Sequence, residues 1–116
     1  MASDRACISP VGMLVQTDAG LMVSYRGALE LDWEIQTPEA PSYPCASCAK
    51  PCTTACPVGA LQGKRYDVEA CRSYVQSDPA QRRLRTGCLA RRACPIGQAY
   101  DRDAAQSAYH MREFLN

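Results

Sequence analysis

Residues 45–57 read Cys-Ala-Ser-Cys-Ala-Lys-Pro-Cys-Thr-Thr-Ala-Cys-Pro, which places four cysteines within twelve residues. Thiolates spaced this closely in one loop can surround a compact, negatively charged cofactor with little loss of chain entropy. The loop supplies three of them, so a distant cysteine must complete the set. Cys94 is the natural candidate, because residues 94–97 read Cys-Pro-Ile-Gly and echo the Cys-Pro-Val-Gly of residues 56–59.

The run is typical of iron–sulfur proteins. Bacterial ferredoxins bind clusters with a C-x2-C-x2-C-x3-C-P run, whose fourth cysteine serves the other cluster where there are two. Residues 45–57 match it except for one extra residue between Cys48 and Cys52. Zinc ribbons use two separated Cys-x2-Cys pairs, and only Cys45 and Cys48 form such a pair here. Disulfides need an oxidising compartment, and residues 1–7 lead into no apolar run typical of a signal peptide, so iron–sulfur is favoured over both.

Length and charge bound the class of protein. A chain of 116 residues forms one small domain, and no apolar run approaches the roughly 20 residues of a membrane span. We therefore expect a soluble, cytoplasmic protein. Residues 1–44 carry a net charge of −4 and residues 45–116 a net charge of +5. A basic cysteine half is expected if it offsets an anionic cluster, although an ordinary solvated surface would show the same balance.

The N-terminal region predicts strands. Short apolar runs at residues 11–16 and 21–25 flank the turn-prone residues 17–20, which indicates a hairpin. Residues 29–35 alternate apolar and acidic side chains, which predicts a half-buried strand with an acidic outer face. Its apolar face would be Leu29, Leu31, Trp33 and Ile35. Residues 37–44 hold three prolines and are expected to form an extended connector into the cysteine loop.

The C-terminal region predicts helices. Asp67 is a plausible N-cap for a helix through Ser77, with an inward stripe of Val68, Cys71, Tyr74 and Val75. Ser77-Asp78-Pro79 offers a second helix start, and Gly87 ends that helix. Residues 88–94 are expected to form a compact loop or helical turn. Asp101 or Asp103 caps a final helix with an inward face of Ala104, Ala105, Ala108, Met111 and Leu115. The predicted class is α+β: a small N-terminal antiparallel hairpin or sheet on a helical, ferredoxin-like cluster domain.

Other reactive residues have ordinary interpretations. Residues 81–92 hold five arginines: Arg82, Arg83, Arg85, Arg91 and Arg92. Such a run can bind RNA phosphates or an acidic protein, but no aromatic residue interleaves to stack bases, so a solvated helix face is favoured. His110, the single histidine, is expected to be an exposed helix residue, and a ligand or acid–base role is less favoured. Cys7 is expected to be a small buried or half-exposed thiol.

From about Ser9 to Ile96, the order of these features resembles the C-terminal half of epoxyqueuosine reductases. That family has a Gly-Leu-Leu-like strand and turn, a longer strand, and a cysteine run closing in Cys-Pro. A helix with a Cys-x-Ser-Tyr-like sequence follows, and then a Gly-Cys that opens the last motif. The corresponding segments here are residues 12–15, 18–20, 29–35, 45–57, 71–74 and 87–95. The chain looks closer still to short bacterial ferredoxin-like relatives of that module.

The resemblance implies one [4Fe–4S] cluster with four cysteine ligands: Cys45, Cys48, Cys52 and Cys94. It implies a second, possible cluster site that is one ligand short: Cys56, Cys71 and Cys88. Arg91 stands where that family's last motif has a cysteine. The fourth position could take a non-cysteine ligand, or Cys7 if the N-terminal strands pack beside it, or the site could hold a [3Fe–4S] core that lacks one iron. Otherwise the three are buried thiols in a vacated site.

Three functions follow as hypotheses. The first is one-electron transfer through a [4Fe–4S] cluster, with a redox protein as partner and no membrane. The alternative is an iron–sulfur subunit or remnant of an epoxyqueuosine-reductase-like, cobalamin-dependent reductase, acting with a separate subunit or tRNA. Nucleic-acid contact is not favoured, and we expect no cobalamin-binding domain here, so the reductase activity is not carried over. A third hypothesis is that the cluster only stabilises the fold of an interaction module. An electron carrier is expected rather than an enzyme on its own.

Overall fold

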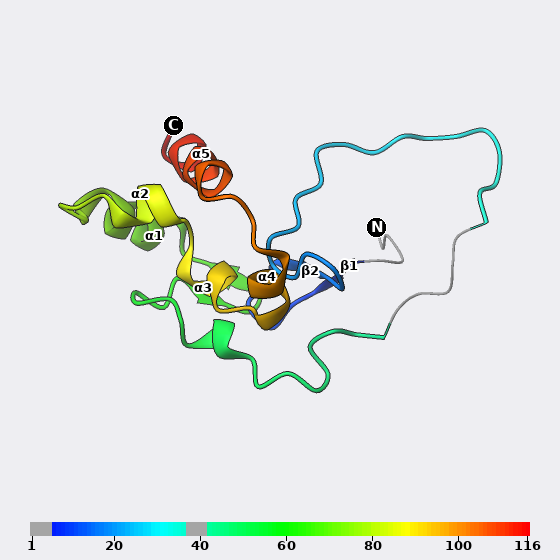
Figure 1. Cartoon of the computed structure of the whole chain (residues 1–116), viewed down its shortest axis with the longest axis horizontal. Helices are drawn as coiled ribbons and strands as arrows, with labels where there is room; N and C mark the ends of the chain where they lie inside the picture. Colours follow the sequence, from blue (N-terminus) through cyan, green and yellow to red (C-terminus); the bar gives the residue numbers. More distant parts are fainter. Residues whose placement is uncertain (1–5, 37–41) are drawn as a thin grey trace.

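The computed structural model describes residues 6–36 and 42–116, and its architecture is mixed α+β (Figure 1). Within these residues the chain forms two antiparallel sheets of two strands each, one short 3-10 helix and five α-helices. The α+β class and the small N-terminal antiparallel sheet are therefore confirmed. Over the same residues, none of the helices has the length and apolar character needed to cross a bilayer.

The N-terminal sheet pairs different segments from those predicted. Strand β1 (Ala6–Ile8) runs antiparallel to β2 (Leu14–Gln16), with Cys7 opposite Val15. The predicted pairing of residues 11–16 with residues 21–25 is wrong, because β2 takes its partner from the preceding segment. A second small sheet, β3 (Leu61–Gln62) with β4 (Arg65–Tyr66), follows the cysteine run.

The predicted turn at residues 17–20 does form. The side-chain oxygen of Gln16 accepts hydrogen bonds from two backbone N–H groups of the turn, at 3.0 and 2.8 Å, and a backbone bridge joins residues 16 and 20. The chain then runs into the core, where Leu21 is only 1 % exposed. The Arg91 guanidinium donates hydrogen bonds to the carbonyls of Leu21 and Val23. An arginine therefore satisfies carbonyls that a partner strand would otherwise have used.

The half-buried strand predicted for residues 29–35 is wrong. This segment forms no strand, and Leu29, Trp33 and Ile35 are 91 %, 64 % and 57 % exposed. In Figure 1 the segment runs away from the helices. Alternation makes a strand only where a neighbouring strand and a covering layer exist, and neither lies beside this segment among the described residues. Residues 37–41 of the predicted connector lie outside the described residues.

Helix α1 (Val68–Ser77) forms as predicted behind Asp67, whose carboxylate accepts a hydrogen bond from the Ala70 N–H at 2.9 Å. Of its predicted inward stripe, Val75 is buried and Cys71 and Tyr74 are half-buried. Val68 is exposed, so its place in the stripe is wrong.

Helix α2 (Arg82–Thr86) starts later than predicted. A turn precedes it, in which the Asp78 carboxylate accepts hydrogen bonds from the backbone N–H groups of Ala80 and Arg83, both at 3.2 Å. The helix ends at Gly87 as predicted, and this residue has a φ of 83° that favours glycine.

Three further helices follow: α3 (Leu89–Arg92), α4 (Pro95–Tyr100) and α5 (Ala104–Leu115). Helix α3 is the helical turn predicted for residues 88–94, whereas α4 was not predicted. Asp103 caps α5 by accepting hydrogen bonds from two backbone N–H groups, at 2.6 and 3.2 Å. On the predicted inward face, Ala108 is buried, but Ala104 and Ala105 are exposed. That part of the prediction is wrong, because the first turn of α5 is exposed, whereas Ser107 lies against Gly87 at the end of α2.

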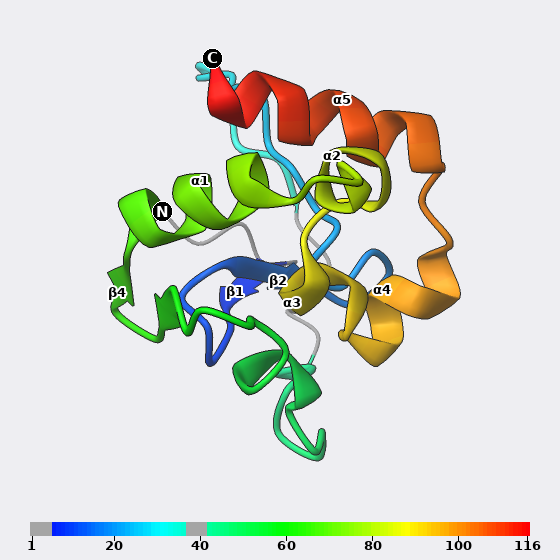
Figure 2. The ribbon, with the colours of Figure 1, turned by 90° about the vertical axis from the view of Figure 1, so that its left-hand side faces the viewer.

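Helix α5 lies across α1 and α2 (Figure 2). Arg72 of α1 donates hydrogen bonds to the carbonyls of Phe114 and Leu115, which have no partner within α5. Its guanidinium also lies 5.9 Å from the centre of the Phe114 ring. These contacts close the layer of helices over the cysteine-bearing loops.

Candidate metal centre

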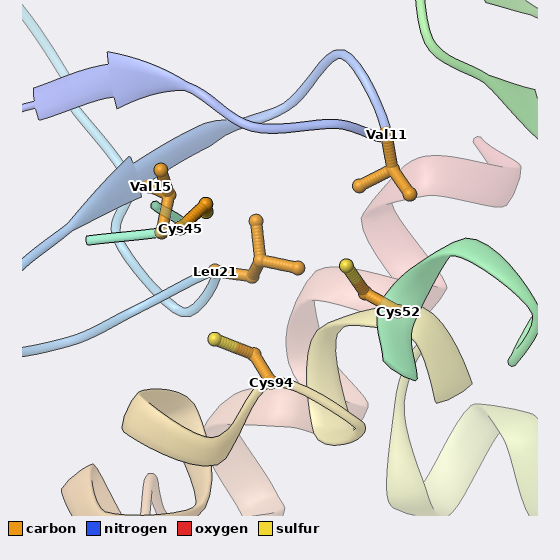
Figure 3. Close-up of a cluster of buried hydrophobic side chains, with 6 residues drawn as sticks. All are labelled: Val11, Val15, Leu21, Cys45, Cys52 and Cys94. Atoms are coloured by element: carbon orange, nitrogen blue, oxygen red, sulfur yellow. The ribbon is translucent and has the colours of Figure 1, made fainter. Parts of the chain in front are cut away.

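The core of the molecule contains three of the four cysteines expected to bind the first cluster. Cys45, Cys52 and Cys94 are 8 %, 6 % and 7 % exposed, and they cluster with Val11, Val15 and Leu21 (Figure 3). They come from three separate elements: the loop before the 3-10 helix η1 (Pro51–Thr53), η1 itself, and the N-cap of α4. Folding therefore brings the cysteine run and the distant Cys-Pro together, as the spacing indicated.

Cys48, the fourth expected ligand, is half-buried beside this group. Burial is the largest factor that raises the pKa values of the Cys45 and Cys52 thiols, and the neighbouring cysteines, Cys48 and Cys94 among them, raise both further. Four thiolates this close repel one another, so the group is stable as thiols or around a cation. Metal ligation requires the thiolate form, and a bound cation supplies the charge that permits it.

Two backbone features shape this first cysteine group. Lys50 has a left-handed φ of 57°, and its N–H donates a hydrogen bond to the Cys48 sulfur at 3.3 Å. Gly20 has a φ of 55°, and a Cβ there would lie 2.8 Å from the Cys94 sulfur. Gly20 was not predicted to belong to the site. In the sequence, only its position at the end of a predicted turn set it apart.

The other three candidate ligands line a separate cavity of about 350 Å³: Cys56, Cys71 and Cys88. The Cys56 sulfur accepts a hydrogen bond from the Ala60 N–H at 3.4 Å. Burial raises the pKa of the Cys71 thiol, a hydrogen bond with Tyr66 lowers it, and Cys88 and Cys56 raise it. Seven of the eight cysteines thus fall into the two groups expected from the sequence, and Cys7 belongs to neither expected group. All eight are free thiols.

Among the described residues, the cavity of the second group is lined by three cysteines and by Arg91, and by no fourth cysteine. Arg91 lines the cavity and donates hydrogen bonds to backbone carbonyls of residues 21 and 23. Cys7 lies on β1, packs against the first cysteine group, and is not among the residues that line the cavity. The structure therefore does not place Cys7 where it could complete the second group.

The basic residues are arranged differently from the sequence expectation. Arg82, Arg85 and Arg92 are exposed, but Arg83 and Arg91 line the cavity, so the run does not form a single solvated face. His110 also lines the cavity and is half-buried, so its expected exposure is wrong. Its Nδ1 lies 3.2 Å from an Arg26 nitrogen. No local pattern could have found these positions, because their neighbours come from distant parts of the chain.

The first group supplies four thiols from separate segments, which is the number and type of donors that a [4Fe–4S] cluster requires. Within residues 6–36 and 42–116, no group of three or more His, Cys, Asp or Glu side chains could hold one metal ion. A [4Fe–4S] cluster is held by four thiolates that surround a polynuclear core, each on a different iron, so they need not meet at one point. The glycine at position 20 lets the backbone of the turn approach the Cys94 sulfur closely, where a side chain would collide with it.

Comparisons with known proteins give no family assignment. No protein-family model matches the chain, and neither the curated proteins nor the solved structures contain a match.

Proposed function

We propose that Cys45, Cys48, Cys52 and Cys94 bind a [4Fe–4S] cluster, and that the chain is a one-electron carrier with a ferredoxin-like cluster domain. The observation that carries this proposal is the convergence of three buried thiols, with Cys48 beside them, from segments far apart in sequence. The bound cluster would supply reversible one-electron reduction. A reducing, cytoplasmic setting is consistent with eight free thiols.

The protein's own groups have defined parts in this function. Val11, Val15 and Leu21 keep water from the Cys45, Cys52 and Cys94 sulfurs. Cys48 is the least buried of the four sulfur-bearing residues, so a redox protein would approach the cluster from this edge. The Lys50 N–H bond to the Cys48 sulfur lowers the electron density of that ligand, which favours the reduced state.

The test is anaerobic reconstitution with iron and sulfide, followed by metal analysis and redox titration. The proposal expects near-equal iron and acid-labile sulfide and a reversible one-electron couple between about −700 and +450 mV. Cys48→Ser should lose the first cluster, whereas the matched control Cys7→Ser should retain it. Stoichiometric zinc without sulfide would refute the cluster. A cluster that cannot be reversibly reduced would refute electron transfer and leave the hypothesis that the cluster only stabilises the fold.

The alternative is an iron–sulfur subunit of a cobalamin-dependent reductase that acts with a separate subunit or tRNA. Co-purification of a corrinoid or tRNA with the chain would favour that alternative over electron transfer alone.

A further inference from the structure

The cavity beside Cys56, Cys71 and Cys88 has an unusual lining. Besides the three thiols it is lined by four side chains with nitrogen donors: Arg83, Arg91, Arg102 and His110. None of the residues that line it is an Asp or Glu, as far as the described part of the chain shows. Three guanidinium groups around one cavity, without a carboxylate, create a strongly positive interior.

Some of these donors already have partners and some do not. Arg91 and Arg102 donate to backbone carbonyls of residues 21–23, which holds both guanidinium groups in place. In contrast, Nη1 of Arg83 is buried and finds no hydrogen-bond partner among residues 6–36 and 42–116. Burying a guanidinium nitrogen without a partner is unfavourable, so the position favours an acceptor from outside the chain.

His110 adds a second donor. An arginine has no acceptor, so the Arg26 guanidinium must donate to Nδ1 of His110. Burial, and then the nearby arginines Arg102, Arg26 and Arg91, hold the pKa of His110 below its usual value. The imidazole is therefore neutral, with its proton on Nε2, and in this state Nε2 donates a hydrogen bond and does not bind metal.

The rest of the lining is apolar and includes Met13, Leu61, Val75, Leu89, Met111 and Phe114. A volume of about 350 Å³ lies at the lower end of the range for small-molecule sites, which is about 300–1,000 Å³. Apolar walls with a few convergent cationic donors suit an organic anion, since guanidinium groups bind carboxylates in a bidentate manner. Inorganic anions would leave the apolar part of the surface uncovered.

We propose that Cys56, Cys71 and Cys88 hold a second [4Fe–4S] cluster with one open coordination position, and that a small organic carboxylate occupies it. Arg83 and His110 bind the carboxylate from the protein side. The proposal rests on the iron–sulfur function proposed above. The first cluster would carry electrons, and the second cluster would bind a ligand. Binding adds a carboxylate oxygen to the iron that no cysteine ligates, so one bond forms, none breaks and no oxidation state changes.

The test uses the reconstituted full chain, reduced with dithionite and titrated with citrate while its electron paramagnetic resonance spectrum is recorded. The expected result is about eight irons per chain and a saturable citrate-dependent change in one of two signals. Arg83→Met should weaken citrate binding at least tenfold while keeping the iron count. Arg82→Met is the matched control, because Arg82 lies on the same helix but is exposed and paired with Asp78 at 3.5 Å. Sodium chloride at equal ionic strength controls for screening.

Each other outcome is informative. About four irons per chain, lost in Cys48→Ser, would overturn this inference and leave the first cluster standing. Eight irons with no response to citrate would mean that the arginines only neutralise cluster charge, which also overturns it. If Arg83→Met loses iron, His110→Leu provides the second test and should weaken citrate binding without changing the iron count. No iron or sulfide at all would refute the proposed function itself.

Discussion

Gly20→Ala tests whether close packing against Cys94 shapes the first cysteine group. Gly20 has a φ of 55°, which an alanine adopts only with strain. The added Cβ would lie 2.5 Å from the backbone nitrogen of Gly97 and 2.8 Å from the Cys94 sulfur. Real Cβ atoms essentially never approach other atoms this closely, so α4 or Cys94 must move. The substitution should therefore destabilise the fold and disturb the first cluster together.

The size of the effect has two parts. The left-handed conformation costs an alanine about 1–2 kcal/mol, and overpacking a well-filled core costs about 1–3 kcal/mol. Gly59→Ala is the matched control, because Gly59 has a φ of 60° but nothing lies within 4 Å of a Cβ there. The difference between the two variants isolates the packing part. Gly27→Ala has neither feature and should be neutral or slightly stabilising.

The assay is urea unfolding of the anaerobic, reconstituted protein by circular dichroism, with iron counted on the same samples. Gly20→Ala should be about 1–3 kcal/mol less stable than Gly59→Ala, and it should lose iron from the first cluster that Gly59→Ala retains. If both variants show the same stability and the same iron content, the packing of Gly20 against Cys94 does not shape the site.

Three further predictions follow from the described residues. Asp103→Ala should cost about 1 kcal/mol in urea unfolding, because it removes the cap of α5, and an unchanged midpoint would contradict that role. The pKa of His110 is lowered, so the unfolded chain binds more protons and stability falls as the pH drops below about 6.5. Urea midpoints at pH 7.5 and 5.5 should therefore differ more in the wild type than in His110→Gln; equal differences would contradict the lowered pKa. Trp33, the single tryptophan, is exposed, so its fluorescence should change little on unfolding, and a large blue-shifted native emission would show that it is buried.

Features that depend on a few neighbouring residues were predictable from the sequence. The Asp67 cap with α1 behind it and the end of α2 at Gly87 rest on hydrogen bonds and torsion angles within one helical turn. The grouping of the cysteine run with Cys94 was also predictable, because ligand spacing in a loop leaves few ways to surround a cluster.

Only the tertiary structure decided which distant segments meet. The alternating pattern of residues 29–35 is compatible with a strand, but a strand needs a partner and a covering layer, and neither is encoded in the segment itself. Similarly, β2 pairs with β1 and not with the segment after the turn. The sequence predicts that Arg83 and His110 are surface residues, yet they line one cavity because α2 packs against α5. A long side chain takes its direction from the sum of many remote contacts, and a local pattern contains none of them.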